Sequence, residues 1–218
     1  MNRIQKIFQN RTEKVIPFIT AGYPSKENTL EMVLAAEESG AAMIELGMPF
    51  SDPLADGPII QEASKIAIDN GVNIQWILEV AAKIRKQSKI PLALMGYINP
   101  LIKYGIKKFI NDCKLAGIDG LIIPDLPPEE AGELMQLAND TKICIILLVA
   151  PNTENERIRE ISKLAGTLIY CVAILGITGG MAADKEALRK YLQRVEANSE
   201  CPFVVGFGIK EREDVVEI

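Results

Sequence analysis

Two acidic residues, Glu45 and Asp56, are the side chains of this sequence best suited to acid–base chemistry. Glu45 lies inside the apolar segment Met43–Gly47, and a carboxylate is costly to bury while it is charged. Burial would raise its pKa and suit it to exchange protons near neutral pH. Asp56 follows in a proline-rich loop, from which a second carboxylate in a different environment could act in the same pocket. The alternative interpretations are a structural glutamate paired with a lysine or arginine, and an ordinary turn aspartate.

The composition argues against most other catalytic groups. The chain has no histidine, which excludes a Ser-His-Asp triad and histidine metal ligands within it. Its four cysteines show no metal-binding spacing, so we expect buried thiols in a reducing cytosol. An acidic cluster could hold Mg²⁺, but nothing else resembles a metal-binding loop, so we expect no metal and no bound cofactor. The members of that cluster would be Glu45, Asp52, Asp56 and Asp125.

Charge and hydropathy exclude two classes of partner. The net charge is −5, and no run of lysine and arginine forms the basic face of a nucleic-acid-binding protein. The longest apolar run, Ile143–Ala150, is too short to span a bilayer, and Met1–Asn10 has no apolar signal-peptide core. We therefore expect a cytoplasmic protein that binds neither nucleic acid nor membrane.

Seven apolar runs of strand length alternate with segments of helical period. Because these runs are continuous rather than alternating, they predict strands buried on both faces, as in parallel sheets. Strict alternation of strand and helix predicts the α/β class, and seven units favour a (β/α)₈ TIM barrel over a doubly wound open sheet. We predict one barrel domain over residues 1–218. The predicted strands are Val15–Ala21, Ala41–Leu46, Ile90–Met95, Gly120–Pro124, Ile143–Val149, Thr167–Ala173 and Pro202–Val205.

Local signals mark some of the intervening helices. Asn73 is predicted to cap the helix that carries Ile77, and Gly117 to end the next one. Thr153 and Glu156 are predicted to form a capping box.

In a barrel the active site lies at the carboxyl ends of the strands, and those ends are informative here. Glycines after the sixth and seventh strands, among them Gly176, Gly179 and Gly208, could present backbone N–H groups to a phosphate. Four aromatic residues could line a flat slot for a ring, although core packing explains any one of them alone. No strand end carries a lysine, which argues against a Schiff-base aldolase. The aromatic residues are Phe18, Tyr97, Tyr170 and Phe207.

Several segments together resemble the tryptophan synthase alpha subunit family. Pro17–Pro24, which reads PFITAGYP, resembles its first strand. Glu45–Pro58, which reads ELGMPFSDPLADGP, is similar to the family signature almost letter for letter and is long enough to be highly specific. Gly176–Gly179 and Gly206–Ile209 match its later loops in order and spacing, so the resemblance covers the whole chain.

The resemblance implies a cofactor-free lyase that cleaves indole-3-glycerol phosphate reversibly to indole and glyceraldehyde 3-phosphate. Glu45 and Asp56 match the two catalytic carboxylates: Asp56 would help remove the indole N–H proton, and Glu45 would move a proton between the side-chain hydroxyl and indole C3. The resemblance also implies a PLP-bearing beta subunit in an α₂β₂ heterotetramer, with Pro49–Asp56 bordering the interface. The implied substrate-binding residues are Phe18, Tyr97, Tyr170, Thr178, Gly179, Phe207 and Gly208.

The sequence departs from the family pattern in two places. The loop after the sixth strand usually reads Ser-Arg-x-Gly-Val-Thr-Gly, whereas Ala173–Gly179 reads AILGITG and lacks the arginine. The family's eighth strand and its phosphate-binding Gly-Ser loop are not in the sequence, so we expect a barrel that is incomplete at its C-terminal side. These departures keep an alternative open, in which the chain mainly binds and activates a beta subunit and has little lyase activity alone. Another phosphate-sugar barrel enzyme is less favoured, because the strand ends carry neither lysine nor histidine.

Overall fold

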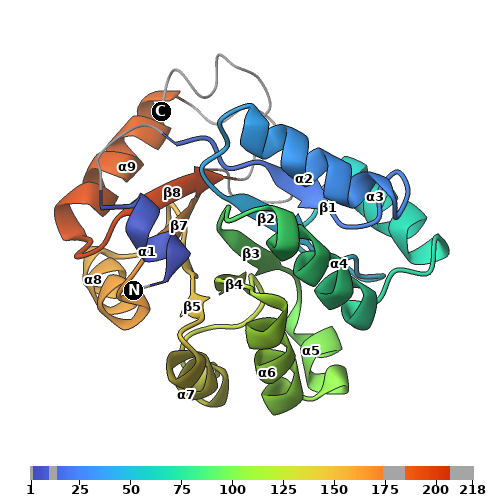
Figure 1. The fold of residues 1–218 in the computed structure, drawn as a ribbon. Helices are drawn as coiled ribbons and strands as arrows, with labels where there is room; N and C mark the ends of the chain where they lie inside the picture. The colour runs from blue at the N-terminus through green and yellow to red at the C-terminus, as the bar shows by residue number, and fades with distance from the viewer. Residues whose placement is uncertain (1, 10–13, 174–184, 207–218) are drawn as a thin grey trace. The chain divides into compact units, whose positions relative to one another are not determined.

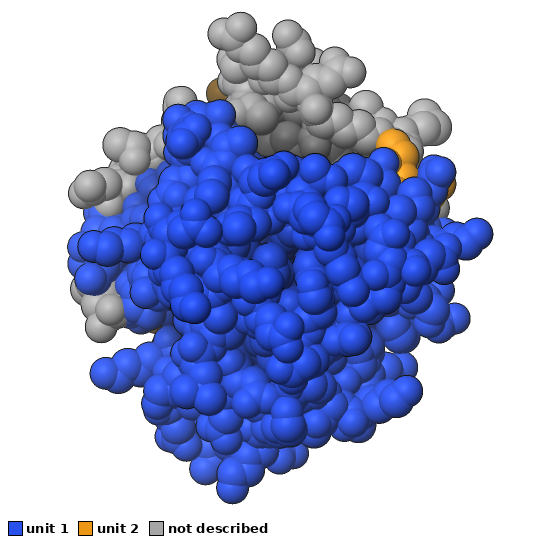
Figure 2. All heavy atoms as spheres, turned by 45° about the vertical axis from the view of Figure 1, so that its right-hand side comes forward, with its two compact units in different colours: residues 1–53, 60–145 blue, residues 54–59, 146–218 orange. Residues whose placement is uncertain are grey.

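The computed structural model describes residues 2–9, 14–173 and 185–206. The chain forms two compact units, residues 1–53 with 60–145 and residues 54–59 with 146–218, which are coloured separately in Figure 2. Each unit has its own parallel sheet. Within the described part of the chain, no helix is both long enough and apolar enough to span a membrane.

The sheet of the first unit has five parallel strands that follow the order of the sequence (Figure 1). All residues of the second and third strands are buried, as their continuous apolar runs predicted. Each strand pairs with the next one along the chain, which is the arrangement that the barrel prediction requires. The strands are β1 (Phe18–Thr20), β2 (Ile44–Gly47), β3 (Leu92–Met95), β4 (Gly120–Ile122) and β5 (Cys144–Ile145).

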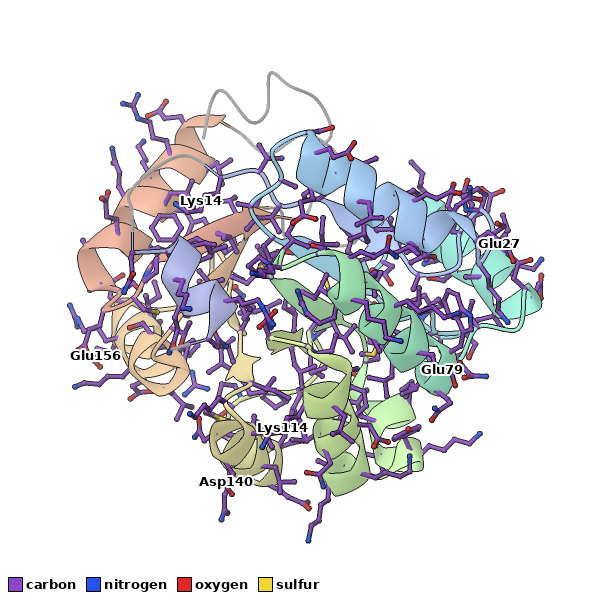
Figure 3. All side chains as sticks on the ribbon, in the orientation of Figure 1. Lys14, Glu27, Glu79, Lys114, Asp140 and Glu156 are labelled. Carbon is purple, nitrogen blue, oxygen red and sulfur yellow. The ribbon has the colours of Figure 1, made fainter. Side chains whose placement is uncertain are left out.

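Helices α2, α4, α6 and α7 pack side by side in this order and lie outside the sheet in Figure 1. Their apolar sides form the core against the strands; in α6, for example, Phe109 and Ile110 are fully buried. Charged side chains such as Glu79, Lys114 and Asp140 point away from the sheet (Figure 3). The helices are α1 (Arg3–Ile7), α2 (Asn28–Glu38), α3 (Pro58–Asp69), α4 (Ile74–Gln87), α5 (Ile98–Tyr104), α6 (Ile106–Ala116) and α7 (Gly132–Thr141).

Two helices, α3 and α5, were not predicted from the sequence, and each has a proline in its first turn. Pro58 is the first residue of α3, and Pro100 lies in the first turn of α5. A backbone N–H in the first turn of a helix has no acceptor within the helix, so a proline costs no hydrogen bond there.

The second unit contains β6 (Leu147–Val149), β7 (Ile169–Val172) and β8 (Phe203–Gly206), with α8 (Asn155–Ala165) and α9 (Lys185–Asn198). The strands are parallel, and β7 lies between β6 and β8. In α9, the Tyr191 hydroxyl donates to the Val149 carbonyl oxygen at 2.8 Å. This bond fixes the helix to the end of β6.

The predicted strand Ile143–Val149 is wrong as a single element. It is divided at Ile146 into β5, which pairs with β4, and β6, which pairs with β7. One apolar run thus pairs with two different strands. A continuous apolar run contains no signal for the residue at which the chain changes its pairing partner. The described residues consequently form eight strands from the seven predicted runs.

The predicted helix ends are partly confirmed. The Asn73 side-chain oxygen accepts from the Trp76 N–H at 3.0 Å, and Gly117 ends α6 with a φ of 79°. The capping box at Thr153 is wrong, because α8 begins after Glu154 and that residue makes no side-chain cap. The Thr153 hydroxyl instead accepts from the Ala150 N–H at 2.9 Å, within the preceding turn.

An ion network centred on the buried Asp119 ties the amino ends of β3 and β4 together. Asp119 precedes β4, is 4% exposed, and accepts from Arg3 at 2.9 Å and Arg85 at 3.1 Å. It also accepts from the Leu92 N–H at 3.0 Å, which joins it to β3. The Asn2 side chain donates to the Asp119 carbonyl oxygen at 2.9 Å, so the network holds α1 as well.

Candidate functional site

Glu45 lies on β2 of the first unit and is 4% exposed, which confirms the burial expected from its sequence setting. In register, it pairs with Phe18 on β1 and Ala93 on β3, and Ala93 pairs with Gly120 on β4. Residues in register on adjacent parallel strands point to the same face of the sheet. The carboxyl group of Glu45 therefore shares its face with one aromatic ring and two of the smallest residues.

The ring of Phe18 reaches diagonally across β2, beyond Glu45. A Cβ placed on Gly47 would lie 2.4 Å from the Phe18 Cζ atom. Gly47 is two residues past Glu45, so the ring runs along the strand toward its carboxyl end. Phe18 is 37% exposed, whereas its neighbour Glu45 is nearly inaccessible. The structure thus brings together Phe18 and Glu45, two of the predicted site residues.

Tyr97 lies after β3, at the N-cap of α5, and is 5% exposed. Its ring centroid is 5.4 Å from that of Phe50, with an angle of 34° between the planes. This contact joins the loop after β2 to the loop after β3. Sequence analysis did not identify Phe50, because nothing in the sequence shows which aromatic residues of two separate loops will meet.

Asp125, which follows β4, holds the start of α5. Its two carboxylate oxygens accept from the Ile98 N–H at 3.0 and 3.3 Å. This role replaces the one considered for it in a magnesium site. Among the described residues there is no group of three or more acidic or cysteine side chains placed to hold a metal ion.

Asp56 lies in the segment 54–59, which belongs to the second unit, and it is half-buried. Two apolar residues flank it on the chain, Leu54 and Ile59, and they are 82% and 73% exposed.

Tyr170 lies on β7 of the second unit and is 5% exposed. A Cβ on Gly206 would lie 1.9 Å from its hydroxyl oxygen, so the ring leans over β8. Tyr170 pairs in register with Val204, and Gly206 is again two residues further on. The same diagonal arrangement of aromatic ring and strand glycine therefore occurs in both sheets. Four predicted substrate-binding residues lie outside the described residues: Thr178, Gly179, Phe207 and Gly208.

The cysteines are consistent with the predicted packing role. Cys113, Cys144 and Cys171 are buried, and Cys201 is partly buried. Burial raises the pKa of Cys113, and it raises the pKa of Cys171 to about 12. A thiol with so high a pKa is a poor nucleophile at neutral pH.

Comparison with known proteins connects this geometry to one family. The family model for the tryptophan synthase alpha chain matches residues 4–218. The tryptophan synthase alpha chain of Petrotoga mobilis is 46% identical over 209 residues, covering 96% of this chain and 81% of the relative. That of Geotalea daltonii is 40% identical over 210 residues, covering 96% of this chain and 80% of the relative.

Solved structures show the same similarity. A structure of the tryptophan synthase a2b2 complex from Pyrococcus furiosus matches with a TM-score of 0.86 and 36% identity, covering 94% of this chain and 82% of that one. The tryptophan synthase alpha subunit of Legionella pneumophila matches with a TM-score of 0.88 and 37% identity, covering 96% and 79%. These neighbours are TIM barrels, which confirms the fold class predicted from the sequence.

Proposed function

The chain belongs to the tryptophan synthase alpha chain family, and from this we infer that it is a lyase of tryptophan biosynthesis. Its reaction is the cleavage of indole-3-glycerol phosphate to indole and glyceraldehyde 3-phosphate. The alternative, a subunit that only binds and activates a partner, gains no support from the comparisons. The observation that carries the proposal is the buried Glu45, which lies in the family motif beside an aromatic ring and two small residues.

The proposed chemistry needs two proton transfers. Asp56 takes the indole N–H proton while Glu45 gives its proton to indole C3, and the ring becomes an electron-accepting imine. Glu45 then takes the proton of the adjacent side-chain hydroxyl, the C–C bond breaks, and its electrons return to the ring. Asp56 returns its proton to the indole nitrogen, so both carboxyls end as they began. A general acid or base placed in this way contributes about 10²–10⁴-fold to a rate.

Glu45 suits this role because it is a carboxyl group buried on a strand of the first unit, beside Phe18 in register. Phe18 and Tyr97 of the first unit, with Tyr170 of the second, would contact the flat indole ring. Gly179 and Gly208 would offer backbone N–H groups to the phosphate, with Thr178 and Phe207 beside them. The proposed mechanism uses no metal and no organic cofactor.

We propose a PLP-dependent beta subunit as the partner, in an α₂β₂ complex like the a2b2 complex of Pyrococcus furiosus. The exposed Leu54 and Ile59, on either side of Asp56, would lie at that interface. Because a biosynthetic lyase acts on a small intracellular metabolite, we place its activity in the cytoplasm.

Indole release from indole-3-glycerol phosphate, measured with and without a beta subunit, tests the proposed function. We expect release by the chain alone and faster release in the complex. Absence of indole under both conditions, from a folded chain, would refute the lyase assignment. Complete loss of activity in a chelator, with recovery on adding Mg²⁺, would refute the metal-free mechanism.

A further inference from the structure

We propose that Gly47 is a specificity-determining residue, because its missing side chain sets the position of the Phe18 ring. The inference rests on the proposed function, in which the Phe18 ring lines one side of the indole-binding site. The three atoms nearest to a Cβ built on Gly47 all belong to Phe18, at 2.4 Å from Cζ, 2.9 Å from Cε2 and 3.3 Å from Cε1. An alanine at this position therefore requires either the ring or the strand to move.

The strand is held more firmly than the ring. Gly47 pairs with Thr20 on one side and Met95 on the other, and its carbonyl oxygen accepts from the Ala21 N–H at 3.0 Å. The Phe18 side chain is 37% exposed and turns about two single bonds. The backbone of Gly47 lies outside the positive-φ region, so alanine fits its conformation. We therefore expect Gly47→Ala to displace the ring and leave β2 in place.

A displaced ring changes the surroundings of Glu45. Phe18 and Glu45 are neighbours in register, and the added methyl group would occupy the ring's present position at the carboxyl end of β2. The ring would then leave Gly47 and move within the face that Phe18 shares with Glu45 and Ala93. The room for a flat aromatic substrate beside the carboxyl group becomes narrower, while the carboxyl group itself keeps its place on the strand.

The second unit shows that this arrangement is not confined to one strand pair. Tyr170 leans over Gly206 with the same offset of two residues past its register partner. In both sheets a strand glycine provides the space for an aromatic side chain of the neighbouring strand. In the first unit, the ring that Gly47 accommodates belongs to Phe18, the register neighbour of Glu45.

The kinetic test measures the reverse reaction of Gly47→Ala, in which indole combines with glyceraldehyde 3-phosphate. The same reaction is then measured with a ring-methylated indole in place of indole. We expect the KM for indole to rise about 10-fold and that for the methylated indole to rise more, with kcat nearly unchanged. The matched control is Gly132→Ala, because a Cβ on Gly132 meets no atom within 4 Å. In this control both KM values should stay at the wild-type level.

A double substitution shows whether the ring transmits the effect. In a Phe18→Ala background, Gly47→Ala should have almost no further effect on KM, because no ring remains to be displaced. An equal increase of KM with and without the ring would overturn the proposal, as would unchanged KM values in the single variant.

A crystal structure of Gly47→Ala provides a readout that does not depend on activity. We expect the Phe18 ring in a new position and β2 unmoved; a displaced strand with the ring in place would refute the inference. If the wild-type chain releases no indole, the proposed function fails instead, and the crystal structure still decides whether Gly47 positions the ring.

Discussion

The first unit buries two acidic side chains equally, Asp119 and Glu45, each 4% exposed, but it surrounds them differently. Asp119, at the amino end of β4, accepts hydrogen bonds from two arginines and a backbone N–H. Glu45 lies within β2, between Phe18 and Ala93 in register. Two arginines surround Asp119 where β3 and β4 begin, whereas the register neighbours of Glu45 on the adjacent strands are apolar. Asp119 thus stabilises the start of the strands, and we propose that Glu45 serves the reaction.

The largest effect on stability should follow from Asp119→Ala. This change leaves Arg85, whose side chain is only 14% exposed, without its carboxylate partner. Burial already lowers the pKa of Arg85, and the Asp119 charge acts in the opposite direction. We expect the free energy of unfolding to fall by about 3–5 kcal/mol, as for the loss of one member of a buried ion pair. Urea denaturation measures this loss, and a change below about 1 kcal/mol would contradict the assignment.

The two arginines of the network should differ from each other. Arg85 also donates to the carbonyl oxygens of Gly117, Ser88 and Ile90, at 2.8–3.2 Å. The Arg3 side chain is 40% exposed, so solvent screens its interaction with Asp119. We expect Arg85→Ala to cost about 3 kcal/mol and Arg3→Ala less than about 1 kcal/mol. Urea denaturation of both variants measures the difference. Equal losses in the free energy of unfolding would show that side-chain exposure does not decide how much each arginine contributes.

A smaller effect is expected from Asp125→Ala, at the opposite ends of the strands. The change removes the acceptor of the Ile98 N–H and should cost about 1 kcal/mol, as for the loss of a helix cap. Asp125→Asn keeps one carboxamide oxygen at the same place and serves as the matched control, with a smaller loss. Differential scanning calorimetry distinguishes the two. If both variants melt at the same temperature as the wild type, this hydrogen bond contributes nothing to stability.

The sequence predicted the alternation of strands and helices because burial on both faces is visible as continuous apolar runs. It could not predict the division at Ile146, since both ladders use the same residue types. Glu45 was identified because a carboxylate stands out within an apolar strand. Asp119 was missed, because Arg3 and Arg85 lie 116 and 34 residues away in the sequence.

The role of Gly47 could not be predicted from the sequence, because it depends on the register between β1 and β2. A single sequence shows that Glu45 and Gly47 lie on one strand, but not which residue of β1 lies opposite them. Once Phe18 is known to pair with Glu45, the bare glycine two residues further on explains where the ring lies.

The comparison between the two carboxylates is tested most directly by indole release and urea denaturation of Glu45→Gln. The amide keeps the size of the side chain but cannot exchange a proton, so we expect the cleavage rate to fall by about 10²–10⁴-fold. The free energy of unfolding should stay within about 1 kcal/mol of the wild-type value. Wild-type turnover by Glu45→Gln would contradict the central claim that this residue carries the proton transfer.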